Sequence, residues 1–121
     1  INNKMEYLNS KLKGEQLSSV EFVQDYLQLH FDGKYLIAYI WPDICDGDNR
    51  YTYGQIDYRN KLCEFIGKII KGVYIEDGKE LNVFFKNENG YIHLNLDPYN
   101  PDIVGDIAMF HDSLDGSYYI L

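Results

Sequence analysis

Residues 20–41 constrain the fold more than any other stretch, because Asp32 and Gly33 lie between two apolar runs within this segment. An Asp-Gly pair in this setting is the strongest short-range signal for a β-hairpin, since its type I′ turn needs a positive φ at both positions. A two-residue turn also fixes the register, so that Leu27 faces Ala38 across the two strands. We therefore predict one long hairpin over residues 20–41.

The alternation of side chains along the strands gives this hairpin two different faces. One face is apolar and suits a core: Leu27, Leu29, Phe31, Leu36, Ala38 and Ile40. The other face mixes aromatic and polar residues: Gln24, Tyr26, Gln28, His30, Tyr35, Ile37, Tyr39 and Trp41. Asp25 falls on the core side, where a carboxylate fits only at an edge, a cap, a bulge or a functional pocket.

The aromatic face has two interpretations. Tyr and Trp combine a large contact area with a polar tip, which suits protein interfaces as well as half-covered cores. Either a helix or a second sheet covers this face, or it binds a protein partner. On the second interpretation the partner-binding residues are Tyr26, His30, Tyr35, Tyr39 and Trp41.

The charge of the chain restricts the kind of partner. Nineteen acidic and eleven basic residues give a net charge of −8 at pH 7. Because binding to phosphates needs a cationic surface, this charge argues against nucleic acid and against an anionic membrane. It favours a basic protein partner, and the acidic residues Asp43, Asp46 and Asp48 after the hairpin are candidates for electrostatic steering.

No pattern of a catalytic or metal site is present. The three Asp residues after the hairpin do not follow the ligand spacing of a calcium loop, and His30, His93 and His111 have no metal-ligand spacing. Cys45 and Cys63 read as two free thiols in a reducing cytoplasm. We therefore expect no metal, no cofactor and no enzymatic activity. The alternative is a small-molecule-binding protein or enzyme with a pocket near Asp25 that uses His30 or His93.

The rest of the chain predicts one α+β domain over residues 1–121, with a mostly antiparallel sheet of about five to six strands and two helices. The helices are expected over residues 3–17 and from a cap at Asp57 to Gly67, with a polar loop over residues 43–54 between hairpin and second helix. Further strands are expected over residues 68–76, 81–86, 91–96 and 117–121, while residues 103–110 suit a helix or a strand equally. A turn at Asn89 and Gly90 places Val83 opposite Leu96. The longest apolar run, residues 35–41, is too short to span a membrane.

Two stretches together show a resemblance to a known family. Residues 22–31 follow the pattern F-V-x-D-Y-L-x-L-x-F, and residues 58–68 follow Y-R-x-x-L-C-x-x-I-G-K. This combination resembles a family of small, stand-alone bacterial proteins of unknown function. Residues 104–110 resemble a later stretch of that family, with departures at Asp106 and Ile107. The resemblance implies a fold and a bacterial origin, and it brings no catalytic residues.

We therefore expect a non-enzymatic, protein-binding domain of the bacterial cytoplasm that uses the aromatic face as its anchor. One specific form is an immunity-type protein that neutralises a basic toxin, which is an analogy with other small acidic bacterial proteins. A homodimer formed through the same face is another form.

Overall fold

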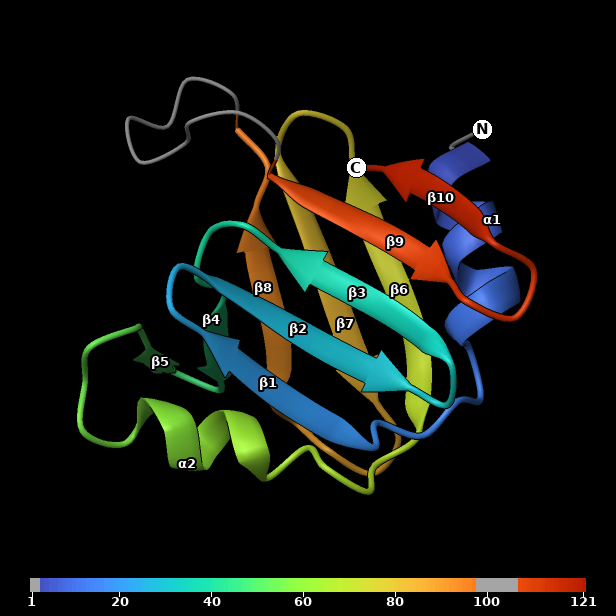
Figure 1. Cartoon of the computed structure of the whole chain (residues 1–121). Helices are drawn as coiled ribbons and strands as arrows, with labels where there is room; N and C mark the ends of the chain where they lie inside the picture. The colour runs from blue at the N-terminus through green and yellow to red at the C-terminus, as the bar shows by residue number, and fades with distance from the viewer. Residues whose placement is uncertain (1–2, 98–106) are drawn as a thin grey trace.

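The computed structural model describes residues 3–97 and 107–121, which form two antiparallel five-stranded sheets and two helices (Figure 1). The predicted α+β class is confirmed. The helices are α1 (Asn3–Leu12) and α2 (Tyr58–Cys63). The first sheet has the order β1 (Ser19–Val23), β2 (Tyr26–Phe31), β3 (Lys34–Ala38), β9 (Ala108–Asp112) and β10 (Ser117–Ile120). The second sheet has the order β5 (Asn49–Tyr51), β4 (Asp43–Asp46), β8 (Tyr91–Asn95), β7 (Glu80–Phe85) and β6 (Ile70–Glu76).

The order of the elements repeats along the chain, although no repeat is visible in the sequence. Each half contains a helix, a three-stranded meander and a two-stranded hairpin. The hairpin of each half joins the sheet of the other half, because β4 pairs with β8 and β9 pairs with β3. The helices also cross over, since α1 packs against β6 and α2 packs against β1. The halves are therefore interlocked, and β10 has the position in the first sheet that β5 has in the second.

The apolar core lies between the facing sides of the two sheets, which are stacked one behind the other (Figure 1). The first sheet contributes Leu27, Leu29, Phe31, Leu36, Ala38, Ala108 and Phe110. The second sheet contributes Ile44, Val73, Ile75, Leu81, Val83, Phe85, Ile92 and Leu94. The predicted core face of the first hairpin is thus buried, except that Ile40 is only half-buried because β3 ends at Ala38.

The first hairpin has the predicted turn and register. Asp32 and Gly33 have φ values of 48° and 87°, and β2 and β3 pair as expected from Leu27 opposite Ala38 to Phe31 opposite Lys34. The extension of this hairpin to residues 20–41 is wrong. Residues 19–23 form a separate strand, β1, which pairs with β2. A turn at Gln24 and Asp25 joins β1 to β2. Asp25 is exposed in that turn, so its carboxylate never enters the core.

The second meander shows a register error in the prediction. Val83 faces Ile92 instead of Leu96, a slip of four residues. Asn87 adopts the positive φ (61°) in the loop, whereas Gly90 is buried beside β4, where an added Cβ would lie 3.4 Å from the Cys45 carbonyl oxygen. Gly90 therefore serves a close approach and not a type I′ turn. Because a slip of four residues preserves the alternation, the predicted core face is unchanged.

Several predicted boundaries also change. The helix expected over residues 3–17 ends at Leu12, with Gly14 at a φ of 89°. The loop expected over residues 43–54 contains the β4–β5 hairpin. Gly67 has a φ of 89°, but α2 ends at Cys63, so the helix end predicted at Gly67 is wrong by four residues. The ambiguous segment of residues 103–110 contains the start of β9, a strand, and residues 103–106 lie outside the described part of the chain.

Candidate functional site

A row of stacked rings crosses the outer face of the first sheet. His30 on β2, Tyr35 on β3, His111 on β9 and Tyr118 on β10 are successive cross-strand partners. Their ring centroids are 4.5, 6.1 and 4.2 Å apart, with interplanar angles of 13°, 22° and 3°. We call these four residues the ring row. Cross-strand contacts of this kind stabilise a sheet by about 0.2–1 kcal/mol per pair and fix the side-chain rotamers.

The ring row belongs to a larger face, which we call the ladder face. The register places these side chains on it: Ser19, Glu21, Val23, Tyr26, Gln28, His30, Tyr35, Ile37, Tyr39, Met109, His111, Tyr118 and Ile120. Tyr39, Ile120 and Tyr118 are 39%, 52% and 61% exposed. Glu21 is its one carboxylate, and it carries no Lys or Arg.

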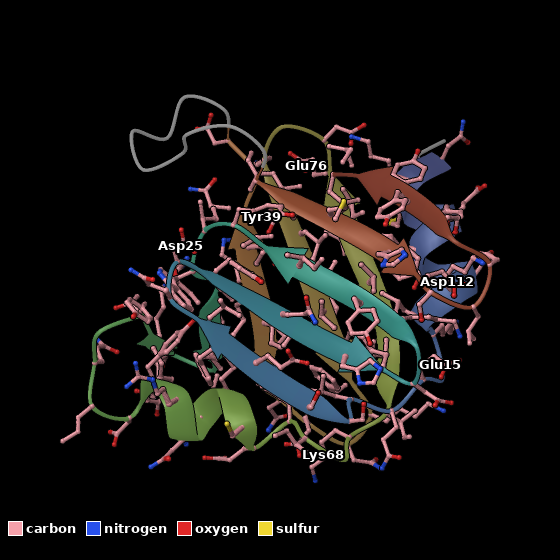
Figure 2. All side chains as sticks on the ribbon, viewed as in Figure 1. Glu15, Asp25, Tyr39, Lys68, Glu76 and Asp112 are labelled. Carbon is pink, nitrogen blue, oxygen red and sulfur yellow. The ribbon has the colours of Figure 1, made fainter. Side chains whose placement is uncertain are left out.

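No helix or strand in residues 3–97 and 107–121 lies over the ladder face (Figure 1). The second sheet covers the opposite face, and the two helices flank the sheets at their sides. Figure 2 shows Tyr39 near the end of the first sheet that carries Asp25, and Asp112 at the other end. Within the described residues, the expected alternative of a covering helix or sheet is therefore wrong.

The first ring of the row is held by the turn that follows it. The Gly33 backbone N–H donates to His30 Nε2 at 2.9 Å, and the Ser18 hydroxyl lies 3.3 Å from His30 Nδ1. Because Nε2 accepts this bond, the neutral imidazole carries its proton on Nδ1 and donates it to Ser18. The turn thus fixes both the tautomer and the ring orientation at one end of the row.

Four of the five predicted partner-binding residues lie together on the ladder face, namely Tyr26, His30, Tyr35 and Tyr39. The fifth, Trp41, does not, because β3 ends before it and the chain crosses to the second sheet. Its ring stacks on Tyr53, with centroids 4.0 Å apart and planes 6° from parallel. Trp41 and Tyr39 line a groove of about 500 Å³ beside the ladder face.

Only two of the four residues of the ring row were identified from the sequence. His111 and Tyr118 lie on β9 and β10, and the segment leading into β9 suited helix and strand equally. The signal that identifies them is the period-2 pattern on both sides of the turn at Asp115 and Gly116, which predicts a hairpin.

The acidic residues expected to steer a partner lie on the second sheet. Asp43 and Asp46 are in β4, and Asp48 is exposed in the turn that follows. Asp43 accepts a hydrogen bond from Arg50 Nε at 2.8 Å, so this ion pair offsets its charge. Asp43 also lines the groove beside Tyr39, whereas Asp46 and Asp48 are farther along the chain from it.

The residues expected to form a ligand pocket do not come together. Asp25 precedes β2 and His30 is near its end, a separation of about 16 Å at 3.3 Å per residue. His93 lies on the outer face of the second sheet, where its Nδ1 is 2.7 Å from Asn82 Oδ1. Burial lowers the pKa of His93, and the nearby Arg50 lowers it further. His93 thus belongs to a satisfied polar network and not to a site with Asp25.

An ion cluster connects α1 to the turn of the β9–β10 hairpin. Lys11 Nζ lies 2.9 Å from Asp112 Oδ2 and 2.8 Å from Asp115 Oδ2. Hydrogen bonds from Lys11 lower the pKa of both carboxyl groups. Because Asp112 is buried, this pairing keeps its charge compensated at the β9–β10 turn.

The described residues contain no group of His, Cys, Asp or Glu side chains arranged to hold a metal ion. Cys45 and Cys63 are free thiols. None of the helices in residues 3–97 and 107–121 is long and apolar enough to cross a membrane. Comparisons with protein-family models, with curated proteins and with solved structures found no match.

Proposed function

We propose that this chain is a non-enzymatic protein-interaction domain that binds a basic protein through the ladder face. The observation that carries the proposal is the ring row on a sheet face that no described helix or strand covers and that carries no Lys or Arg. Tyr is enriched among the residues that dominate binding energy at protein interfaces. Exposed aromatic and apolar side chains that form one continuous face mark an interaction site more often than scattered ones do.

The stacking of the rings supports this function energetically. Binding normally costs about 0.5–1.5 kcal/mol for each rotamer-rich side chain that becomes immobile at the interface. The rings of the ring row already hold one another in place, with the His30 ring also fixed by the adjacent turn. The loss of side-chain entropy on binding is therefore small at the centre of the face.

The charge favours a basic partner over a second copy. Two copies with a net charge of −8 repel each other, whereas a basic protein is attracted and associates faster. Asp25 and Asp32, in the turns at either end of β2, add negative charge at the rim of the face. A toxin-neutralising, immunity-type role in the bacterial cytoplasm is one form of this proposal. The free thiols of Cys45 and Cys63 agree with a reducing compartment.

The test is to isolate a partner by affinity capture, identify it, and measure its binding by calorimetry with both proteins purified. Tyr39→Ala/Tyr118→Ala is the test variant, because both side chains are exposed on the ladder face. Tyr74→Ala is the matched control, since Tyr74 is 41% exposed on the outer face of the second sheet.

The proposal predicts that the double variant binds at least about tenfold more weakly, which corresponds to about 1.4 kcal/mol, while Tyr74→Ala binds like the wild type. Circular dichroism establishes that all three proteins are folded. Equal affinity of the wild type and the double variant would refute the ladder face as the binding surface. Loss of binding in the Tyr74→Ala protein alone would place the interface on the second sheet.

A further inference from the structure

The edge of β6 in the second sheet is closed by α1 and the segment after it. The Asn9 side chain accepts a hydrogen bond from the Val73 N–H and donates one to the Val73 carbonyl, both at 2.8 Å. Ile70 in the same strand bonds to backbone groups of Gly14 and Glu15, at 2.9 and 2.8 Å. The outward backbone groups of Ile70 and Val73 are therefore already occupied and closed to a foreign strand.

The edges at β1 and β5 are protected by other means. β1 carries the exposed Glu21 at its centre, and α2 packs against this strand. β5 has only three residues, and Arg50 is the middle one. Shortness, charge and cover are the devices by which proteins prevent unwanted strand addition at an edge.

The edge at β10 is also short, and Tyr7 of α1 contacts its Ser117 and Tyr119 side chains, but this edge carries no charge that would oppose an added strand. Its residues are Ser, Tyr, Tyr and Ile, without a charge or a proline, and among the described strands it pairs with β9 alone. Leu121 N–H donates to the Ala108 carbonyl, and bonded residues alternate along an antiparallel pair. Tyr119 therefore directs its backbone groups toward β9, whereas Tyr118 and Ile120 direct theirs outward. The Ser117 N–H donates to Asp115 Oδ1 in the preceding turn. Within residues 3–97 and 107–121, no strand pairs with the two N–H and two C=O groups of Tyr118 and Ile120.

We infer that the β10 edge is a strand-addition site for an extended, cationic segment of a protein partner. This inference rests on the proposed function, because it specifies how the basic partner of the ladder face docks. Strand addition supplies main-chain hydrogen bonds for affinity and leaves alternate side chains to set specificity.

The ring row explains why the added segment gains from this position. His111 stacks on one face of the Tyr118 ring, at 4.2 Å between centroids, and the other face is directed toward the open edge. A residue that pairs with Tyr118 on an added strand would extend the row. An Arg side chain suits this position, since its planar guanidinium stacks on aromatic rings and is attracted to them.

The charge around the edge selects a cationic segment. Residues 107–121 contain no Lys or Arg, and Asp112 and Asp115 of the β9–β10 hairpin share the single cation of Lys11. The net charge of −8 would repel an acidic segment, and it would repel a second copy of the chain in the same way. The incoming strand is therefore an Arg- or Lys-bearing segment with apolar side chains at alternate positions.

The test uses a synthetic peptide of alternating Arg and Val with blocked ends, titrated into the isotope-labelled protein and followed by amide NMR shifts. We expect saturable shifts at Tyr118 and Ile120. The same peptide with Glu in place of Arg should bind at least about tenfold more weakly. A peptide N-methylated at alternate residues cannot donate the ladder hydrogen bonds, and it should lose binding to the same extent without any change in the protein.

Ile120→Pro is the matching protein variant. It removes an outward N–H that β9 does not use, and proline is tolerated on edge strands. It should abolish binding of the Arg-Val peptide, while Tyr74→Ala, on the outer face of the second sheet, should leave binding unchanged. Failure of the peptide to bind, or equal binding of the N-methylated peptide, would overturn the inference.

Two further outcomes separate this inference from the proposed function. Peptide binding that survives Ile120→Pro but is lost in Tyr39→Ala would place the segment on the ladder face, overturning strand addition and leaving the proposed function intact. Concentration-dependent dimerisation of the wild type that Ile120→Pro abolishes would show that a second copy uses the edge, which would also overturn the inference.

Discussion

The closure of the β6 edge makes a quantitative prediction for Asn9→Ala. The Asn9 amide satisfies both backbone groups of Val73, and its Nδ2 also lies 2.9 Å from the Met5 carbonyl. Each of the two bonds to Val73 stabilises the fold by about 1 kcal/mol, so the pair contributes about 2 kcal/mol. Alanine favours the helix interior by about 0.6 kcal/mol over asparagine. We therefore expect the free energy of unfolding to fall by about 1.4 kcal/mol.

Urea denaturation followed by circular dichroism measures this change. Ser10→Ala is the control, because Ser10 is the exposed neighbour on the same helix and its hydroxyl donates to the Tyr7 carbonyl within that helix. It should change the stability by no more than about 0.5 kcal/mol. Asn9→Asp should cost more than Asn9→Ala, since it places a carboxylate oxygen against the Val73 carbonyl. An Asn9→Ala protein as stable as the wild type would refute the reasoning, because the bonds that close the β6 edge would then contribute nothing.

Three further predictions concern pH and the ring row. Burial lowers the pKa of His93, so the wild type should lose stability as the pH falls from about 6.5 through that lowered pKa, and His93→Gln should remove this loss. Lys11 lowers the pKa of Asp112, so the stability from this contact should be present above about pH 4 and disappear in stronger acid, and Lys11→Met should weaken that acid dependence. Melting temperatures measured from pH 8 to pH 2 test both. In a double-mutant cycle, His111→Ala and Tyr118→Ala should be coupled by about 0.5–1 kcal/mol.

Each of these predictions has an outcome that contradicts it. A His93→Gln protein with the wild-type slope of stability between pH 7 and pH 5 would show that this residue does not couple folding to protons. An acid transition unchanged by Lys11→Met would show that the Lys11 ion cluster does not couple folding to protons. Additive effects of the two ring-row substitutions would mean that the parallel rings do not stabilise each other.

The parts of the fold that could be predicted were those set by local chemistry. The turn at Asp32 and Gly33 fixed the register of its hairpin, because only a narrow set of φ values permits such a turn. The same pattern predicted a wrong register at Asn89 and Gly90, because Gly90 is needed for close packing on β4 and does not form a type I′ turn. Local sequence cannot distinguish a glycine used for its φ from one used for its small size.

The arrangement in two sheets was not predictable in this way. The pairing of β3 with β9 joins segments more than sixty residues apart, and no periodicity reports which hairpin crosses to which sheet. For the same reason, only part of the candidate site could be predicted from the sequence. Tyr35 was identified from its own hairpin, whereas His111, its partner on β9, required that long-range pairing to be known.

The ladder face can be tested most directly by hydroxyl-radical footprinting of the chain, alone and bound to its purified partner. Exposed aromatic and sulfur-containing side chains react readily, and both sheets carry such groups on their outer faces. The account predicts that binding lowers oxidation at Tyr39, Met109 and Tyr118 and leaves Tyr74 unchanged. Protection of Tyr74 with no change at Tyr39 and Tyr118 would contradict the central claim.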